Sequence, residues 1–224
     1  MNRFSLMVGA VLVLSASTAD AAQRKNYGRP VETSESRMRA SIRGFAYCSM
    51  GKDESRVRDL LEYEIGSRTE AQIVKKLQAP ARGCVDPTWP DLSASLVRGA
   101  LAENLYRREF GREVFEKPAT QPPLPETFAV VAADRAGTEE QKNDWYLAAI
   151  SNCAVFVSPD LAHELLLIPS DVPEEAEAFD KLRPAYSQCT GGKEFTAPVG
   201  VMRPFLSEAL LRWSRRYRRG RTDA

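Results

Sequence analysis

The chain has 224 residues, of which 43% are hydrophobic and 27% charged, a balance typical of globular proteins with a packed core. Its formal net charge is +1, so the overall charge gives no reason to expect a nucleic-acid partner. The length fits one or two domains.

Residues 1–22 have the features of a secretory signal peptide. Arg3 supplies a positive charge, Leu6 to Leu14 form an apolar run, and Ala19-Asp20-Ala21 offers small residues to a signal peptidase. The nine-residue apolar run is too short for a membrane-spanning helix, which needs about 20 residues. No other stretch is long enough either. We therefore expect an exported protein, periplasmic or extracellular, with a mature chain that starts at Ala22 or Gln23 and has no transmembrane segment.

Four short helices are predicted in the next part of the chain, residues 23–111. Ile42 and Phe45 have helical spacing, and Asp53 can cap a second helix. Ser67-x-x-Glu70 predicts a capping box in front of a third helix over 71–77. The fourth covers LVRGALAENLYRR, residues 96–108.

A proline-rich linker is predicted at residues 112–135. Its segment 117–125 contains Pro118, Pro122, Pro123 and Pro125, and should be stiff and non-helical. The apolar segment FAVVAAD, residues 128–134, fits either a short strand or an extended cover over the core.

Four further helices are predicted in residues 136–224. The first contains Leu147 and Ile150, and Ser158-Pro159 begins the second with a capping residue and an N-terminal proline. The third follows Pro173, over EEAEAFDKLR. The fourth covers VMRPFLSEALLRW, and we expect Pro204 in its first turn because an interior proline disrupts a helix.

The two halves resemble each other at an offset of 105 residues. Both cysteine pairs, Cys48/Cys84 and Cys153/Cys189, are 36 residues apart, and the offset carries one pair onto the other. The same offset aligns other identical residues, namely Leu60/Leu165, Leu61/Leu166, Glu70/Glu175, Ala71/Ala176, Lys76/Lys181, Leu77/Leu182, Arg98/Arg203, Leu101/Leu206, Glu103/Glu208, Leu105/Leu210 and Arg107/Arg212. These matches predict an all-α tandem duplication of one four-helix module.

The repeat also favours one disulfide pairing among the three that are possible. Duplication of a self-contained module preserves bonds inside it, so we expect Cys48–Cys84 and Cys153–Cys189. Each bond should tie the end of a first helix to the loop before a fourth. A zinc site is less favoured because there is no Cys-x-x-Cys and His163 is the only histidine. Neither a metal nor a cofactor is expected.

Signals for catalysis are weak. Ser49-x-x-Lys52 matches the nucleophile motif of serine β-lactamases, but its companion motifs are missing and the second half has Ala154 and Val157 at these positions. No cysteine or serine near His163 in the sequence is a credible nucleophile for it to activate. His163 therefore fits a surface or core-edge position. No catalytic residue is assigned.

The candidate binding residues are arginines. Glu103/Arg107 and Glu208/Arg212 are spaced as ion pairs along a helix, whereas Arg98 and Arg203 are not. Arg98 and Arg203 either bond loop carbonyls near the disulfides or contact duplicated ligands.

The C-terminal helix is expected to bury one face. That face comprises Phe205, Leu206, Ala209, Leu210, Trp213 and Tyr217. Beside it lies an arginine cluster, Arg215, Arg216, Arg218 and Arg219, which is either a solvated helix end or a site for an anionic envelope component. The sequence thus favours a non-catalytic exported binding protein, whose partner is an anionic envelope component or a protein. The alternatives are an envelope enzyme with an unfamiliar site and a purely structural envelope protein.

Overall fold

The computed structural model describes residues 34–79, 83–84, 93–113, 115 and 137–217. Within these ranges the chain is all-helical, as predicted, with seven helices and no strand. The helices are α2 (Ser34–Glu62), α3 (Arg68–Leu77), α4 (Ala94–Phe110), α6 (Glu139–Val157), α7 (Pro159–Leu167), α8 (Pro173–Cys189) and α9 (Val199–Tyr217). The predicted signal peptide, the segment 128–134 and most of the linker lie outside the described residues.

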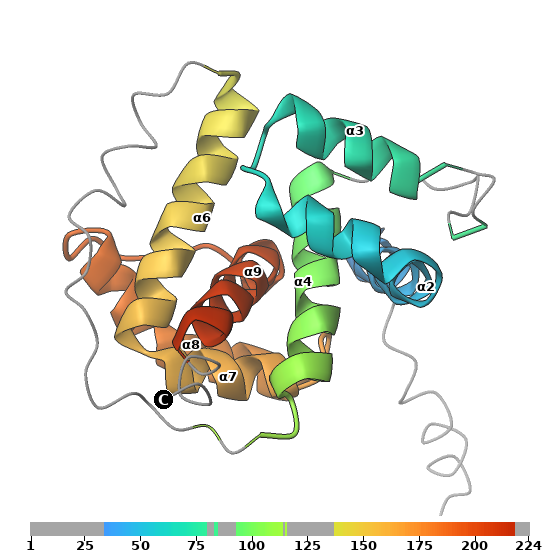
Figure 1. Ribbon diagram of the computed structural model, residues 1–224. Coiled ribbons are helices and arrows are strands. Elements are labelled where there is room, and N and C mark those ends of the chain that lie inside the picture. The colour runs from blue at the N-terminus through green and yellow to red at the C-terminus, as the bar shows by residue number, and fades with distance from the viewer. Residues whose placement is uncertain (1–33, 80–82, 85–92, 114, 116–136, 218–224) are drawn as a thin grey trace, which may run out of the picture.

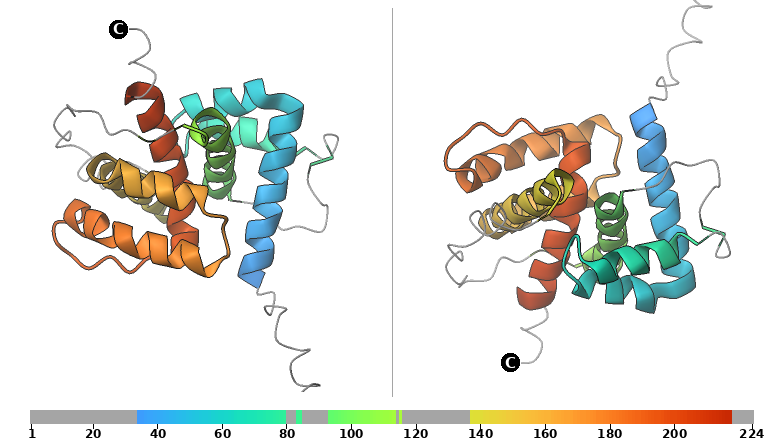
Figure 2. Two further views of the ribbon diagram at one scale, coloured as in Figure 1. Left: turned by 90° about the horizontal axis from the view of Figure 1, so that it is seen from below. Right: turned by 90° about the horizontal axis from the view of Figure 1, so that it is seen from above.

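Two helices form the centre of the molecule. α4 and α9 make the most extensive helix–helix contact, with α2 and α3 on the α4 side and α6, α7 and α8 on the α9 side (Figures 1 and 2). The next most extensive contacts are α6 with α9 and α2 with α4. Their buried apolar side chains form one continuous core, in which Leu101, Leu105, Leu206 and Leu210 are fully buried.

α2 is two helical segments joined at a kink. The backbone of Asp53 is non-helical there, with φ −155° and ψ 63°, and its Oδ1 accepts a hydrogen bond from Arg56 N. Ser158, which is 105 residues further on, separates α6 from α7 with φ −138° and ψ 68°. The predicted helix boundaries at Asp53 and Ser158 are therefore confirmed, and Pro159 takes the first position of α7. The Ser158 side chain makes no capping hydrogen bond, however, so the capping role expected of it is wrong.

The capping residues of α3 differ in part from the prediction. Ser67 Oγ accepts a hydrogen bond from Glu70 N, as expected. The Glu70 carboxylate accepts from Gly66 N instead of Ser67 N, so the predicted capping box is wrong in its second half. The other oxygen of the Glu70 carboxylate accepts a hydrogen bond from Arg98.

The position of Pro204 was predicted wrongly. α9 begins at Val199, so Pro204 lies inside the helix and not in its first turn. A proline there cannot donate to the carbonyl of Gly200, four residues earlier. Pro204 packs against Gly99 at the place where α9 crosses α4.

Gly99 lets the two central helices approach closely. A Cβ atom at this position would lie 2.3 Å from Pro204 Cα and 2.5 Å from Pro204 O. Gly99 and Pro204 are 105 residues apart, so the crossing point joins positions that the repeat aligns. Only glycine fits this contact.

Replacing Gly99 with alanine should therefore force α4 and α9 apart and lower the free energy of unfolding by roughly 1–3 kcal/mol. Gly44→Ala is the matched control, since Gly44 is also helical and an added Cβ there would meet no atom within 4 Å. That control should gain up to about 1 kcal/mol from helix propensity. Urea unfolding followed by circular dichroism measures both, and equal stabilities of the two variants would show that the crossing does not require glycine.

The pairing of the cysteines and the buried face of the C-terminal helix match the predictions. Cys48 bonds Cys84 and Cys153 bonds Cys189. Cys189 is the last residue of α8, however, because that helix runs on through Pro184, so the expected loop position is wrong for this half. On α9 the predicted face is buried at Phe205, Leu206, Ala209, Leu210 and Trp213, with Tyr217 packed at its margin.

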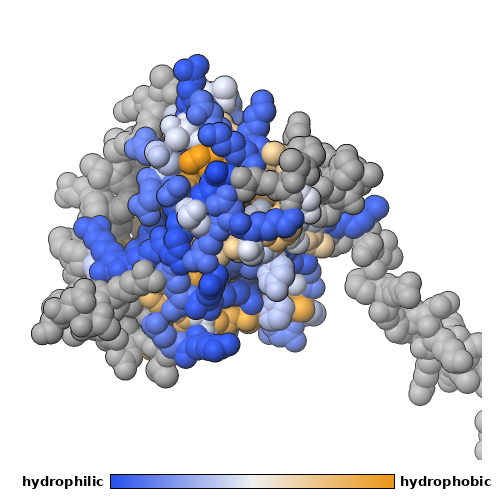
Figure 3. Space-filling model, turned by 45° about the vertical axis from the view of Figure 1, so that its right-hand side comes forward, coloured by the Kyte–Doolittle hydropathy of each residue, from blue (hydrophilic) through white to orange (hydrophobic). Residues whose placement is uncertain are grey.

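One face of the molecule is largely polar. The face shown in Figure 3 is mostly hydrophilic and carries only small apolar areas. None of the described helices is long and apolar enough to cross a membrane.

Candidate functional site

Arg98 is fully buried between the two halves of the chain. Its Nε and Nη2 donate to the Glu208 carboxylate of α9 at 2.6 and 2.8 Å, and its Nη1 donates to Glu70 at 3.3 Å. The remaining donors reach carbonyl oxygens at the C-terminal end of α2, those of Leu60, Leu61 and Tyr63. A cation there complements the negative end of the helix dipole.

Arg203 makes the corresponding set of contacts. Its Nε and Nη2 donate to the Glu103 carboxylate of α4 at 2.9 and 2.8 Å, and its Nη1 donates to Glu175 at 2.8 Å. Its Nη2 also reaches the Ile168 carbonyl oxygen at the end of α7, at 2.8 Å. Arg107 shares both Glu103 and the Ile168 oxygen.

The two arginines thus exchange partners between the halves. Arg98 pairs with Glu208, whose repeat counterpart is Glu103, and Glu103 pairs with Arg203. Burial works against the charged form of each arginine, but hydrogen bonds and the charge of the facing glutamate outweigh it and raise the pKa of Arg98 and of Arg203. Burial also raises the pKa of Glu70.

This buried network leaves little opening for a ligand. Arg98 is 0% and Arg203 4% exposed, and their donors are engaged by glutamates and carbonyl oxygens of the chain. The carbonyl contacts expected of these arginines are present, but they lie at helix ends and not beside the disulfides. The predicted helical ion pairs Glu103/Arg107 and Glu208/Arg212 are part of the same network.

The predicted arginine cluster at the end of α9 is only partly described. Arg215 bonds Glu109 at 3.1 and 3.2 Å and lies near Glu62, while Arg216 is exposed and lies over the Tyr217 ring. Arg218 and Arg219 lie outside the described residues.

The two residues considered for catalysis lie in the core. Ser49 is 3% exposed, so a substrate cannot reach its hydroxyl. His163 is 6% exposed, and its Nδ1 hydrogen-bonds the Tyr106 hydroxyl while its ring packs on Phe115. Among the described residues no group of histidine, cysteine and carboxylate side chains could hold a metal ion.

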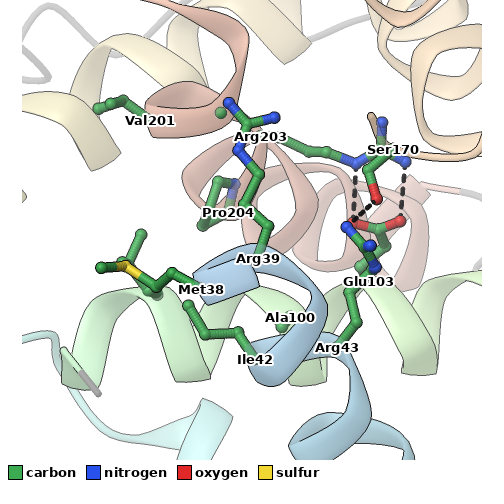
Figure 4. A pocket seen from close by; sticks show the side chains of 12 residues that line it. Met38, Arg39, Ile42, Arg43, Ala100, Glu103, Ser170, Val201, Arg203 and Pro204 are labelled. Atoms are coloured by element: carbon green, nitrogen blue, oxygen red, sulfur yellow. Dashed lines mark hydrogen bonds and ion pairs between the residues drawn. The ribbon is translucent and has the colours of Figure 1, made fainter. Parts of the chain in front are cut away.

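A pocket of about 240 Å³ opens between α2, α4 and α9 (Figure 4). Its wall is mainly apolar: Ile42 comes from α2, Leu96 and Ala100 from α4, and Pro204 from α9. Two of the few large hydrophobic side chains that the described surface exposes also line it, Met38 at 43% and Val201 at 39% exposure. Exposed apolar side chains beside an apolar hollow are typical of a binding site.

One rim of the pocket is charged. Arg39 and Arg43 extend from α2 toward the α7–α8 loop, where Arg43 Nη1 donates to Ser170 Oγ at 2.7 Å and to Asp171 Oδ2 at 2.5 Å. Arg39 Nη1 donates to Asp171 Oδ1 at 3.2 Å, and its guanidinium lies against Gly200. The Asp171 backbone has a left-handed conformation, with φ 67°. Gly66, at the aligned position, is also left-handed, with φ 78°.

The positions that correspond to the pocket in the other half carry different side chains. Ala100 aligns with Phe205, which is 5% exposed, and Arg43 aligns with Ala148. Arg39 aligns with Asp144, whose pKa is raised by burial and which hydrogen-bonds Ser95, the counterpart of Gly200. A small residue at position 100 thus leaves space where the other half buries a phenyl ring.

None of the pocket residues except Arg203 was predicted as a site residue. The one sequence signal for them was the contrast of Ala100 with Phe205 within the best-matched helices of the repeat. Comparisons of the chain with protein-family models, with curated proteins and with solved structures gave no match.

Proposed function

We propose that this chain is an exported binding protein and that its ligand occupies the pocket between α2, α4 and α9. The observation that carries the proposal is the pocket itself, an apolar hollow whose mouth exposes Met38 and Val201. Burying such side chains under a ligand is favourable by about 25 cal/mol per Å² of apolar surface. Its charged side chains are engaged in ion pairs, Glu103 with Arg203 and Arg43 with Asp171, which supports binding over catalysis.

We further propose that the chain is a tandem duplication of a module that once formed a symmetric dimer. In a two-fold symmetric interface, a residue that contacts a second residue is itself contacted by that residue's counterpart. Arg98–Glu208 and Arg203–Glu103 follow this rule, and the aligned residues Gly99 and Pro204 meet each other, as positions on a two-fold axis do.

Duplication explains how one half could acquire a pocket. Fusion of two copies frees each half to change independently, while the shared network of arginines and glutamates holds the central helices together. The half that carries Ala100 contributes α2 and α4 to the ligand site, and the half that carries Phe205 contributes Ser170 and the first turns of α9.

Export is supported by two features of the chain. The first 22 residues have the pattern of a signal peptide. All four cysteines are paired, and disulfides persist in oxidising compartments such as the periplasm or the extracellular space.

Filling the pocket should abolish binding. Ala100→Phe copies the side chain of the other half and should remove at least about nine-tenths of the binding of N-phenyl-1-naphthylamine, a neutral apolar dye, because the ring takes the ligand's place. Ala176→Phe adds the same ring at an exposed position of α8 and should leave binding unchanged. Dye fluorescence measures both, and circular dichroism checks the fold.

If the wild-type chain and the Ala100→Phe variant bind the dye with the same affinity, the dye binds outside this pocket, and the proposal is contradicted. No binding by the wild-type chain would contradict it as well.

A further inference from the structure

The pocket combines an apolar wall with a charged rim on one side, where Arg39 and Arg43 lie near Glu103, a carboxylate that is ion-paired with Arg203. Arg39 and Arg43 are one turn apart on α2, so their side chains leave the same face of the helix. The apolar residues Met38 and Ile42 lie on the other side of the hollow from Ser170, in the α7–α8 loop that the arginines reach. A ligand that fills this space contacts hydrocarbon along most of its length and cations at one end.

Arg43 has hydrogen-bonding capacity that the described residues do not use. Only its Nη1 donates within the described part of the chain, to Ser170 and Asp171, and its side chain is 42% exposed. Its Nε and Nη2 remain to donate to a ligand at the pocket mouth. A guanidinium offers its donors in a planar fork that matches a carboxylate or a phosphate.

Asp171 shows which chemistry this rim accepts. Its carboxylate already bridges Arg39 and Arg43, at 3.2 and 2.5 Å, from a loop position in the other half of the chain. Its side chain is 26% exposed, so the ion pairs lie at the surface, where such pairs contribute less than about 1 kcal/mol. A second anionic group can therefore join or replace Asp171 at little cost.

We propose that the ligand is a single-chain amphiphile with an anionic head, a carboxylate or a phosphate monoester. Its apolar chain lies against Ile42, Leu96 and Pro204, and its head binds Arg43 with support from Arg39. The inference rests on the proposed function, because it names the class of ligand for that same pocket.

The test compares four probes with the same twelve-carbon chain, each below its micelle-forming concentration. Dodecanoate and dodecyl phosphate carry the two anionic heads, dodecanol is neutral and dodecyltrimethylammonium is cationic. Calorimetric titration of the mature full chain should give Kd values at least about tenfold lower for an anionic probe than for dodecanol, as a charge-assisted hydrogen bond implies. The cation should bind more weakly than dodecanol.

Three variants locate the head group. Arg43→Gln should bring the affinity for dodecanoate to within about twofold of that for dodecanol, because the guanidinium is gone. Arg37→Gln is the matched control, because Arg37 is an exposed arginine on the same helix and does not line the pocket. It should change neither the affinity for dodecanoate nor that for dodecanol. Asp171→Asn should strengthen dodecanoate binding by up to about fivefold, since it removes the competing carboxylate.

The effect expected of Asp171→Asn is a gain in affinity, which a folding defect would not produce. Asparagine also tolerates the left-handed backbone at this position. Dodecanol binding as tightly as dodecanoate, with both lost in Ala100→Phe, would overturn the anionic head and leave the pocket as the ligand site. No binding of any of the four probes would overturn both proposals.

Discussion

Replacing Arg98 with methionine should lower the free energy of unfolding by about 3–5 kcal/mol. The substitution leaves Glu70 and Glu208 buried without their shared cation, and it leaves three carbonyl oxygens at the end of α2 without that donor. Removing one partner from a buried ion pair costs far more than removing the pair, because the remaining charge stays desolvated. Urea unfolding followed by circular dichroism measures the loss.

Two further variants sharpen this test. Arg203→Met should cost an amount in the same range, because its contacts with Glu103 and Glu175 correspond to those of Arg98. Lys142→Met removes an ion pair in which Glu139 is 91% exposed, and should cost less than about 1 kcal/mol. A loss for Arg98→Met as small as the loss for Lys142→Met would show that the buried network does not hold the central helices together.

Replacing Cys153 and Cys189 together with alanine should lower the free energy of unfolding by about 2–5 kcal/mol. The bond closes a loop across a separation of 36 residues, for which the chain-entropy model gives roughly 4 kcal/mol. Cys48→Ala with Cys84→Ala should have an effect of similar size, because that bond spans the same separation.

Reduction of the wild-type chain provides the control for the disulfide variants. Dithiothreitol should destabilise the wild type by at least as much as either double variant, and should remove the remaining bond in each. An unfolding midpoint that does not move when the bonds are reduced would contradict a stabilising role for them.

Local patterns in the sequence predicted the helices well. Ser158-Pro159 placed the start of α7, and the spacing of Phe205, Ala209 and Trp213 gave the buried face of α9. These features depend on backbone geometry and helical periodicity, which short segments carry by themselves. The equal cysteine spacing also predicted both disulfides, because it assigned one bond to each half of the chain.

Features that depend on contacts between the halves were not predictable in the same way. Pro204 was placed in the first turn of its helix because an interior proline disrupts a helix. Nothing in the sequence shows that Gly99 lies against it. The retained arginine and glutamate of each half look the same whether they pair inside one half or exchange partners. Only the packing of α4 on α9 decides between these arrangements.

The sequence analysis did not predict the pocket, because the pocket depends on a small side chain. Sequence motifs for function consist of reactive or charged residues, whereas Ala100 matters for the space it leaves. Arg39 and Arg43 also lie in a poorly matched part of the repeat, where Asp144 and Ala148 take their places. The difference between Ala100 and the aligned Phe205 is the sequence feature that the proposed ligand site depends on.

A crystal structure grown with 12-bromododecanoate would show directly whether the pocket holds the apolar chain of an anionic amphiphile. The bromine atom marks the end of the chain through its anomalous signal. We expect one bromine position per protein chain between α2, α4 and α9, with the carboxylate on Arg43. A bromine position elsewhere, with this pocket empty, would contradict the proposal.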